Sequence, residues 1–143
     1  LDQELGWSWE LLWKLLKAFV LNRQSPARAW EVGEEHYDRG NDLFRHMLDD
    51  RMVYSCGYWR RADTLAEAQT AKLDLICQEL DLQPGMRGLD IGCGWGGFAE
   101  HAASEYGVEV VGVTVSEEQV PLARVRCAEL PVDIRLQDYR DVD

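Results

Sequence analysis

A glycine-rich segment beside a single carboxylate is the part of this sequence best suited to chemistry. Residues 89–97 read LDIGCGWGG, with Asp90 directly before the first glycine of the turn. A glycine turn between a strand and a helix lets a ligand approach the backbone, and the helix N-terminus supplies N–H groups that face it. So many glycines cost conformational entropy, which argues for a functional reason to keep them. The segment therefore predicts a cofactor-binding loop.

Two classes of cofactor use a loop of this kind, and the position of the acid distinguishes them. Gly92, Gly94 and Gly97 fit the spacing of the dinucleotide fingerprint. That fingerprint needs an acidic residue about 20 positions further on, at the ribose, but residues 111–115 read VGVTV. Asp90 instead precedes the glycines, where a carboxylate suits a cationic ligand. The sequence favours S-adenosylmethionine, which carries a sulfonium and an ammonium, and an NAD-linked oxidoreductase is the alternative.

The pattern around this loop predicts the elements that hold it. In chain order we expect a strand at 86–91, a helix at 98–106, a strand at 108–115, a helix from 116 to about 130 and a strand at 132–137. Residues 116–119 (SEEQ) are typical of a capping box, and Pro121 is expected to disturb the first turns of that helix. The order predicts an α/β fold, the first half of a doubly wound, Rossmann-like parallel sheet.

A helical extension is predicted before the sheet. We expect a helix over 5–21, a connection over 22–34, a short helix capped by Asn41, an extended stretch at 52–59 and a helix at about 65–80. A capping box from Thr64 to Glu67 opens the last of these, with Leu80 among its inward residues. The chain thus divides into an N-terminal amphipathic helix and linker (1–34), a helical cap with an active-site loop (35–82) and the cofactor-binding half-domain (83–143).

The first predicted helix has an unusually narrow polar stripe. Glu10, Lys14 and Lys17 lie within a narrow sector of a helical projection, and most other positions are apolar. Trp7, Trp9 and Trp13 carry an apolar ring with a polar N–H, which suits the boundary between water and an apolar phase. Two interpretations stay open: burial against the rest of the protein, which we favour, and contact with a membrane surface.

Composition and charge exclude several classes of protein. The chain has 143 residues, of which 46% are hydrophobic and 29% charged, as expected for one globular domain. A formal net charge of −11 argues against a nucleic-acid partner. No apolar run reaches the roughly 20 residues of a membrane-spanning helix, and no secretory signal is visible. The chain begins at Leu1 and stops just after the expected third strand, so we expect a piece of a longer protein.

The four cysteines give no sign of a metal site or of disulfides. They are far apart and form no C-x-x-C pair. Reduced thiols in the cytoplasm are therefore expected, and no metal.

Five short motifs follow one another around the glycine-rich loop. They are residues 36–44 (HYDRGNDLF), 54–59 (YSCGYW), 68–72 (AQTAK), 89–97 (LDIGCGWGG) and 113–119 (VTVSEEQ). In this order and spacing they resemble the cyclopropane-fatty-acyl-phospholipid synthases and the related mycolic-acid cyclopropane synthases. The resemblance runs from about residue 27 to the end of the chain.

The resemblance implies a methyltransferase-type enzyme of lipid biosynthesis. Such an enzyme transfers a methylene group from S-adenosylmethionine to the cis double bond of an unsaturated phospholipid acyl chain, and a cyclopropane fatty acid forms. A bound bicarbonate would take the proton that leaves as the ring closes. A homodimer in the cytoplasm, in peripheral contact with the inner face of the membrane, is also implied. Further groups of the bicarbonate pocket would lie beyond Asp143, so the isolated chain is expected to bind cofactor weakly and not to catalyse.

Two other functions stay open beside this one. Some amine N-methyltransferases share the framework, so methyl transfer to another substrate such as an amine is the first. A non-catalytic lipid-surface module built on the first helix is the second. Cys56 and the tryptophans of that helix favour a lipid substrate.

The resemblance also implies roles for individual residues by motif position. Cys56 would line the bicarbonate pocket as the catalytic residue, and His36 and Tyr37 would lie near the site. The remaining candidates would bind S-adenosylmethionine: Asp90, Gly92, Gly94 and Gly96 at its methionine part, Thr114 and Gln119 at its ribose, Tyr139 with Asp138 and Arg140 at its adenine, Tyr54 and Ser55 from the opposite side, and Cys93, Trp95 and Ser116 within the same loops.

Overall fold

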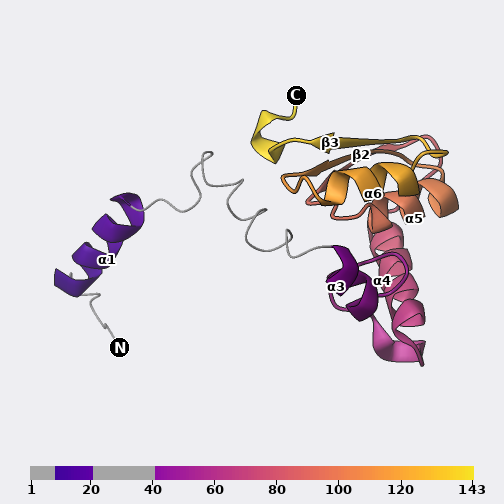
Figure 1. Cartoon of the computed structure of the whole chain (residues 1–143), viewed down its shortest axis with the longest axis horizontal. Helices are drawn as coiled ribbons and strands as arrows, with labels where there is room; N and C mark the ends of the chain where they lie inside the picture. Colours follow the sequence, from indigo (N-terminus) through magenta and orange to yellow (C-terminus); the bar gives the residue numbers. More distant parts are fainter. Residues whose placement is uncertain (1–8, 21–40) are drawn as a thin grey trace.

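The computed structural model describes residues 9–20 and 41–143, and Figure 1 shows their elements in sequence colours. Residues 5–8 and 21 of the predicted first helix, the connection over 22–34, and His36 and Tyr37 lie outside the described residues. The elements are α1 Trp9–Val20, α3 Asn41–Met47, the 3-10 turn η1 Trp59–Arg61, α4 Leu65–Glu79, β1 Arg87–Ile91, α5 Gly97–Tyr106, β2 Glu109–Thr114, α6 Gln119–Arg126, β3 Val132–Leu136 and the 3-10 turn η2 Tyr139–Asp141.

The three strands form one parallel sheet in the order β1-β2-β3, with β2 in the centre. Its register pairs Asp90 with Gly112 and Thr114 with Leu136. Figure 1 shows α5 and α6 next to each other along the sheet, and α4 packs against α5. Because the strands are parallel, their carboxyl ends lie at one edge, where α/β sheets commonly bind ligands. The predicted α/β fold with its β-α-β-α-β order is therefore confirmed.

Small side chains build the core between the sheet and the helices. Close packing is visible at Gly96, where an added Cβ would lie 3.2 Å from Cys127 Sγ. Burial raises the pKa of Cys77 and Cys127 to about 11 and that of Cys93 to about 12, so these thiols stay protonated and pack as hydrophobic groups. The core consists of Cys77, Cys93, Ala99, Ala102, Val108, Val110, Val120, Ala123, Cys127 and Ile134.

A second cluster joins α3 to the glycine-rich loop. Phe44, Met52 and Trp95 are buried together, and the ring centroids of Phe44 and Trp95 are 4.9 Å apart. The indole N–H of Trp95 donates to Asn41 Oδ1 at 2.8 Å, and Asn41 Nδ2 donates to the carbonyl of Glu118 at 3.2 Å. Asn41 is the first described residue of α3, and through these two bonds its side chain joins the start of this helix to the glycine-rich loop and to Glu118.

The predicted strands are confirmed to within one residue at either end. They were expected at 86–91, 108–115 and 132–137 and are observed at 87–91, 109–114 and 132–136. The loop predicted over 52–59 is confirmed in that residues 52–58 form neither helix nor strand, but it is not extended throughout. Met52 has φ +55°, the chain bends at Ser55, and a 3-10 turn begins at Trp59.

The capping box predicted at the start of α4 is confirmed. Thr64 Oγ1 accepts from the Glu67 N–H at 3.3 Å, and Glu67 Oε2 accepts from the Thr64 N–H at 3.1 Å. The prediction that Leu80 faces inward is wrong, because α4 ends at Glu79 and Leu80 is 60% exposed. The buried face of α4 includes Gln69 and Cys77 instead.

The start of α6 differs from the prediction. The capping box at Ser116 is absent, since α6 begins at Gln119 and ends at Arg126. A competing interaction explains the difference: Thr114 Oγ1 accepts from the Ser116 N–H at 3.2 Å and donates to Gln119 Oε1 at 2.8 Å. Pro121 consequently lies in the first turn, where its missing N–H costs no intrahelical bond. The expected disturbance of the helix does not arise.

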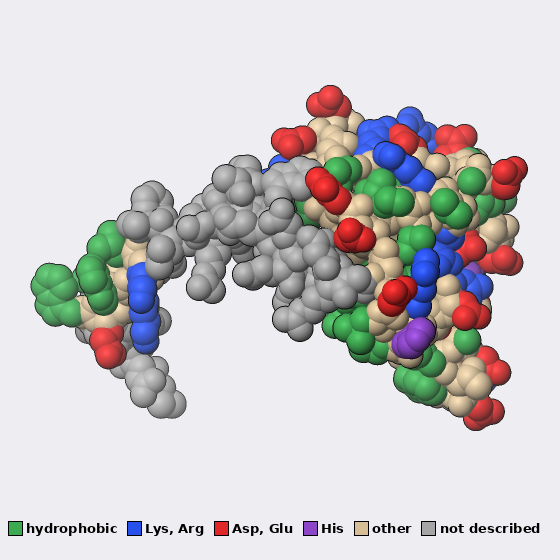
Figure 2. All heavy atoms as spheres, in the orientation of Figure 1, with side chains coloured by type: hydrophobic (Ala, Val, Ile, Leu, Met, Phe, Trp, Pro, Cys, Tyr) green, Lys and Arg blue, Asp and Glu red, His purple; other side chains and the backbone are tan. Residues whose placement is uncertain are grey.

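The described side chains of α1 are exposed. Trp9 is 87% and Trp13 68% exposed. The interpretation favoured from the sequence, that this helix is buried against the rest of the protein, therefore does not hold for the described side chains. Figure 2 shows hydrophobic side chains along one side of α1 and basic ones along another. Lys14 and Lys17 lie on this helix, one turn apart. Among the described helices, none has both the length and the apolar character needed to span a bilayer.

Candidate active site

A cleft of about 630 Å³ opens at the carboxyl ends of β1 and β2. Its size falls within the range of roughly 300–1,000 Å³ that small-molecule sites occupy. The walls come from β1, the glycine-rich loop, the end of β2, one side of α4 and the segment at 52–55. The predicted site residues that line it are Tyr54, Ser55, Asp90, Gly92, Cys93, Gly94, Trp95, Thr114, Gln119 and Tyr139.

Five predicted site residues lie outside the lining of the cleft. Gly96 and Ser116 are packed behind it, and Cys56 is an exposed free cysteine. Asp138 and Arg140 flank Tyr139 after β3. Asp138 accepts from Arg140 Nε at 2.9 Å and from the Arg140 N–H at 3.0 Å, and this pairing lowers the pKa of Asp138 to about 2.

The glycines of the loop divide into two groups by what surrounds them. Gly92 and Gly94 have φ values of +76° and +57°, and a Cβ added at either would meet nothing within 4 Å. Their bare backbone therefore faces the open cleft and can be approached by a ligand. Gly96 has φ +81°, but its Cβ would lie 3.3 Å from Ala123 Cβ. Gly92 and Gly94 leave room for a ligand, whereas Gly96 lets α5 and α6 pack closely.

Asp90 supplies the negative charge of the cleft. Its carboxyl group comes from the end of β1 and lies in a partly buried wall. Burial raises the pKa of Asp90 from 3.8 to about 6, and the ammonium group of Lys72 limits the rise. A carboxylate that is poorly solvated in this way gains most from a bound cation, because the cation replaces the lost hydration.

The end of β2 holds a buried polar pair. Thr114 Oγ1 donates to Gln119 Oε1 at 2.8 Å, and both residues line the cleft. The two residues are five positions apart and meet because the chain turns from β2 into α6. This pair places a hydroxyl and an amide where the missing carboxylate of the dinucleotide fingerprint would stand. Tyr139, after β3, forms another part of the wall.

The segment at 52–55 is tied down by side chains that the site prediction did not include. Gln69 of α4 is buried and donates through Nε2 to the carbonyl of Ser55 at 2.7 Å and to that of Val53 at 3.2 Å. Lys72 Nζ donates to Ser55 Oγ at 2.9 Å. The only sequence signal for these two residues is the motif at 68–72, to which no role was assigned.

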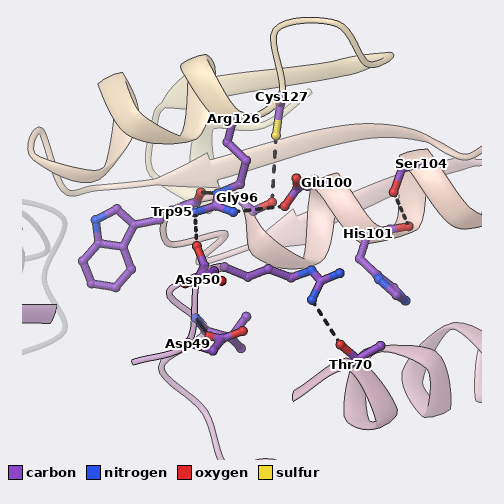
Figure 3. A network of polar contacts seen from close by, with 12 residues as sticks. Asp49, Asp50, Thr70, Trp95, Gly96, Glu100, His101, Ser104, Arg126 and Cys127 are labelled. Carbon is purple, nitrogen blue, oxygen red and sulfur yellow. Dashed lines mark hydrogen bonds and ion pairs between the residues drawn. The ribbon is translucent and has the colours of Figure 1, made fainter. Parts of the chain in front are cut away.

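Arg126 of α6 holds the glycine-rich loop from behind. Figure 3 shows its guanidinium next to the Trp95 carbonyl and Glu100. Arg126 Nε donates to the Trp95 carbonyl at 3.0 Å, NH1 to Glu100 Oε2 at 3.1 Å and NH2 to the Asp50 carbonyl at 3.0 Å. One side chain thus joins α6, the loop, the first turn of α5 and the turn before Met52. Sequence reasoning missed Arg126, since nothing local indicates a partner 76 residues away.

The family profile and the curated relatives match most of this chain. The profile of the mycolic acid cyclopropane synthetase family matches residues 24–143. The cyclopropane-fatty-acyl-phospholipid synthase of Escherichia coli (strain K12) is 59% identical over 130 residues, which cover 91% of this chain and 34% of that protein. Cyclopropane mycolic acid synthase 2 of Mycobacterium leprae (strain TN) is 45% identical over 121 residues, covering 79% and 39%. The chain spans about a third of the length of the curated relatives it matches.

Solved structures agree with the sequence comparisons. The crystal structure of mycolic acid cyclopropane synthase CmaA1 complexed with SAH and CTAB superposes with a TM-score of 0.76 at 40% identity, covering 80% of this chain and 42% of that one. Coclaurine N-methyltransferase bound to N-methylheliamine and SAH gives a TM-score of 0.70 at 31% identity, covering 79% and 34%. With the profile extending over residues 24–143 and a fold shared with these enzymes, the chain belongs to the mycolic acid cyclopropane synthetase family.

Proposed function

We propose that the protein transfers a methylene group from S-adenosylmethionine to the cis double bond of unsaturated phospholipid acyl chains, so that cyclopropane fatty acids form. The 59% identity to the Escherichia coli phospholipid synthase supports a phospholipid substrate. The observation that carries the cofactor assignment is the bare backbone at Gly92 and Gly94 next to the partly buried Asp90. This arrangement suits a small cationic ligand far better than a pyrophosphate.

The residues of the cleft fit S-adenosylmethionine part by part. Asp90 would attract its cationic methionine part, and the backbone at Gly92 and Gly94 would lie against it. Thr114 and Gln119 would bind the ribose hydroxyls, and Tyr139 would lie at the adenine. When bound, S-adenosylmethionine supplies an electrophilic methyl group.

Cys56 is proposed to line a bicarbonate site for the proton that leaves as the ring closes. It follows Ser55, whose carbonyl is held by Gln69, so its backbone position is fixed beside the cleft. The Cys56 side chain is exposed, and Cys56 is not among the residues that line the cleft.

Peripheral contact with the cytoplasmic face of a membrane is part of the same proposal. Substrate acyl chains are embedded in a bilayer, so an enzyme acting on them must approach its surface. The exposed Trp9 and Trp13 of α1 suit the interface, and Lys14 and Lys17 would lie near anionic lipid headgroups. A homodimer is proposed as well, from the family resemblance alone.

The decisive experiment is an assay of the full-length protein with vesicles of unsaturated phospholipid and methyl-labelled S-adenosylmethionine. We expect labelled acyl chains that are heavier by one methylene group and have lost the double bond. Asp90→Asn is expected to lower the activity strongly. Asp133→Asn is the matched control, because Asp133 is exposed on β3 and pairs with Arg135 at 2.7 Å. If the wild-type protein binds S-adenosylmethionine but no labelled lipid forms, the proposed substrate is overturned.

A second candidate is methyl transfer to an amine. The fold shared with coclaurine N-methyltransferase is the observation that favours it. The same labelled cofactor, offered with a panel of tertiary and secondary amines in place of vesicles, separates the two functions. Label in the amine and none in the lipid would favour the second candidate.

A further inference from the structure

Two side chains carry all the formal charge in the lining of the cleft that the structure describes. One is Asp90 at the end of β1, and the other is Lys72 on α4. The rest of the lining is backbone, apolar or neutral polar. Lys72 is also the only lysine between residues 41 and 143. The proposed function assigns a role to Asp90 and none to Lys72.

The ammonium group of Lys72 is held at the cleft by its surroundings. Nζ donates to Ser55 Oγ at 2.9 Å, and the Ser55 carbonyl is fixed by Gln69 at 2.7 Å. An ammonium has three N–H donors, and Ser55 takes one of them. Burial lowers the pKa of Lys72, while the charges of Asp49 and Asp90 raise it. The cation is thus partly desolvated, and it lines the same cleft as Asp90, whose charge acts on it.

We propose that the ammonium group of Lys72 binds the α-carboxylate of the cofactor's methionine part, while Asp90 takes the cationic groups. The cleft then presents one positive and one negative group to an amino-acid zwitterion. This inference rests on the proposed binding of S-adenosylmethionine and deepens it. It gives the motif at 68–72 a function. Gln69 fixes the backbone of Ser55, and the Ser55 hydroxyl in turn holds the ammonium group of Lys72 at the cleft.

Charge balance supports this assignment over a structural role for Lys72. A ligand carboxylate brought into a half-buried cleft without a cation would lose hydration and gain nothing in return. Lysine suits such a site because its ammonium is a compact point charge with rotatable donors on a flexible stem. If Lys72 had a purely structural role, it would serve only to bind the Ser55 hydroxyl. The affinity for a ligand without a carboxylate would then equal the affinity for the same ligand with one.

A small carboxylate-like anion such as bicarbonate is the other source of the same chemistry. Lys72 is close enough to Cys56 and Asp90 to interact electrostatically with both. The experiment must therefore separate a carboxylate that belongs to the cofactor from one that binds independently.

The test compares two ligands on the full-length protein at about pH 8, well above the pKa of about 6 that Asp90 has beside Lys72. The first ligand is S-adenosylhomocysteine, and the second is its decarboxylated form, which keeps the amine and lacks the α-carboxylate. Calorimetry with Lys72→Met, Lys72→Arg and the wild type gives six affinities. Arg45→Met is the matched control for the loss of one positive charge, because Arg45 is exposed on α3 and does not line the cleft.

We expect Lys72→Met to bind S-adenosylhomocysteine about 10- to 100-fold more weakly and the decarboxylated ligand within about 2-fold of wild type. Lys72→Arg is expected to recover part of the loss, and Arg45→Met to bind both ligands like wild type. Normal binding of the decarboxylated ligand also reports that the variant is folded.

Three results would overturn the inference. Equal losses for both ligands would mean that Lys72 acts through Ser55 or through the fold. An effect of Lys72→Met that appears only when bicarbonate is added would assign the ammonium to the independent anion. If the wild type binds neither ligand, both the proposed cofactor and this inference are overturned. The first two results overturn only the inference and leave the cofactor assignment intact.

Discussion

Replacing Asp90 by asparagine removes a charge while leaving the shape of the side chain nearly unchanged. Burial in the wall of the cleft raises the pKa of Asp90 from 3.8 to about 6. Each pKa unit corresponds to 1.36 kcal/mol, so ionised Asp90 would cost about 3 kcal/mol of unfolding free energy. The cleft is open to water, which lowers the expected cost to about 1–3 kcal/mol. The unliganded Asp90→Asn variant should therefore be more stable than wild type near neutral pH.

The pH dependence gives this prediction its sign. A carboxyl group with a raised pKa in the folded state contributes stability that is full below its unfolded pKa of about 4 and is lost as the pH rises through about 6. The difference between Asp90→Asn and wild type should thus be small at about pH 4 and reach its full size by about pH 8. Denaturant unfolding of the unliganded full-length protein at both pH values measures it.

Binding of a cationic ligand should respond in the opposite direction. The ligand stabilises ionised Asp90, so the affinity of wild type for S-adenosylhomocysteine should fall as the pH drops below about 6, by up to about tenfold per pH unit. Asp90→Asn should bind about 10- to 100-fold more weakly at about pH 8 and lose this part of the pH dependence. Asp133→Asn, on the exposed part of β3, is the control for both measurements.

Two outcomes would refute the reasoning. A stability difference that is equal at both pH values would show that the Asp90 carboxyl group is not desolvated. Unchanged affinity in Asp90→Asn would show that this carboxylate does not face the ligand. A variant that is stabilised without ligand and weakened in binding is the combination that only a ligand-facing, poorly solvated acid explains.

Two further substitutions test the scaffold of the cleft. Arg126→Met should cost about 2–4 kcal/mol of unfolding free energy and weaken cofactor affinity, because three hydrogen-bond acceptors lose their donor. Denaturant unfolding measures the first effect and calorimetry the second. Arg135→Met removes only an exposed ion pair and should change neither quantity. Gly97→Ala should cost about 1–3 kcal/mol and displace the segment after Arg51, since the added Cβ would lie 2.9 Å from the Arg51 carbonyl oxygen. Gly88→Ala, whose Cβ would meet only an ordinary 3.8 Å contact, should be tolerated in the same thermal unfolding assay, and similar losses in both glycine variants would contradict the argument.

Signals that are local in the chain made much of the fold predictable. The β-branched run at 108–115 and the capping box at Thr64 each specify their element through neighbours within a few residues, and both are confirmed. The sequence at 116–119 has the same local form, but the capping box predicted there is not formed. There the hydroxyl of Thr114 binds the backbone first, which shows how one bond from the end of a strand can shift a helix by three residues.

The residues that line the candidate site were largely predictable. The spacing of Asp90, Gly92 and Gly94 identifies them, and all three line the cleft together with Thr114, whereas Gly96 does not. The side chains that hold the cleft from outside could not be found in this way. Gln69 reaches a carbonyl 14 residues away and Arg126 one 76 residues away, so their partners exist only once the sheet and helices are packed.

The burial of Cys77, Cys93 and Cys127 gives the molecule a built-in labelling position. Their raised pKa values keep these sulfurs in the unreactive protonated form, and the packed interior shields them from reagents. Cys56 is the one exposed thiol of the four, and it lies one residue from Ser55 at the rim of the cleft. Among these four cysteines, a maleimide fluorophore would therefore attach to Cys56 in preference to the three buried thiols, and its emission would report ligands that arrive at the rim of the cleft.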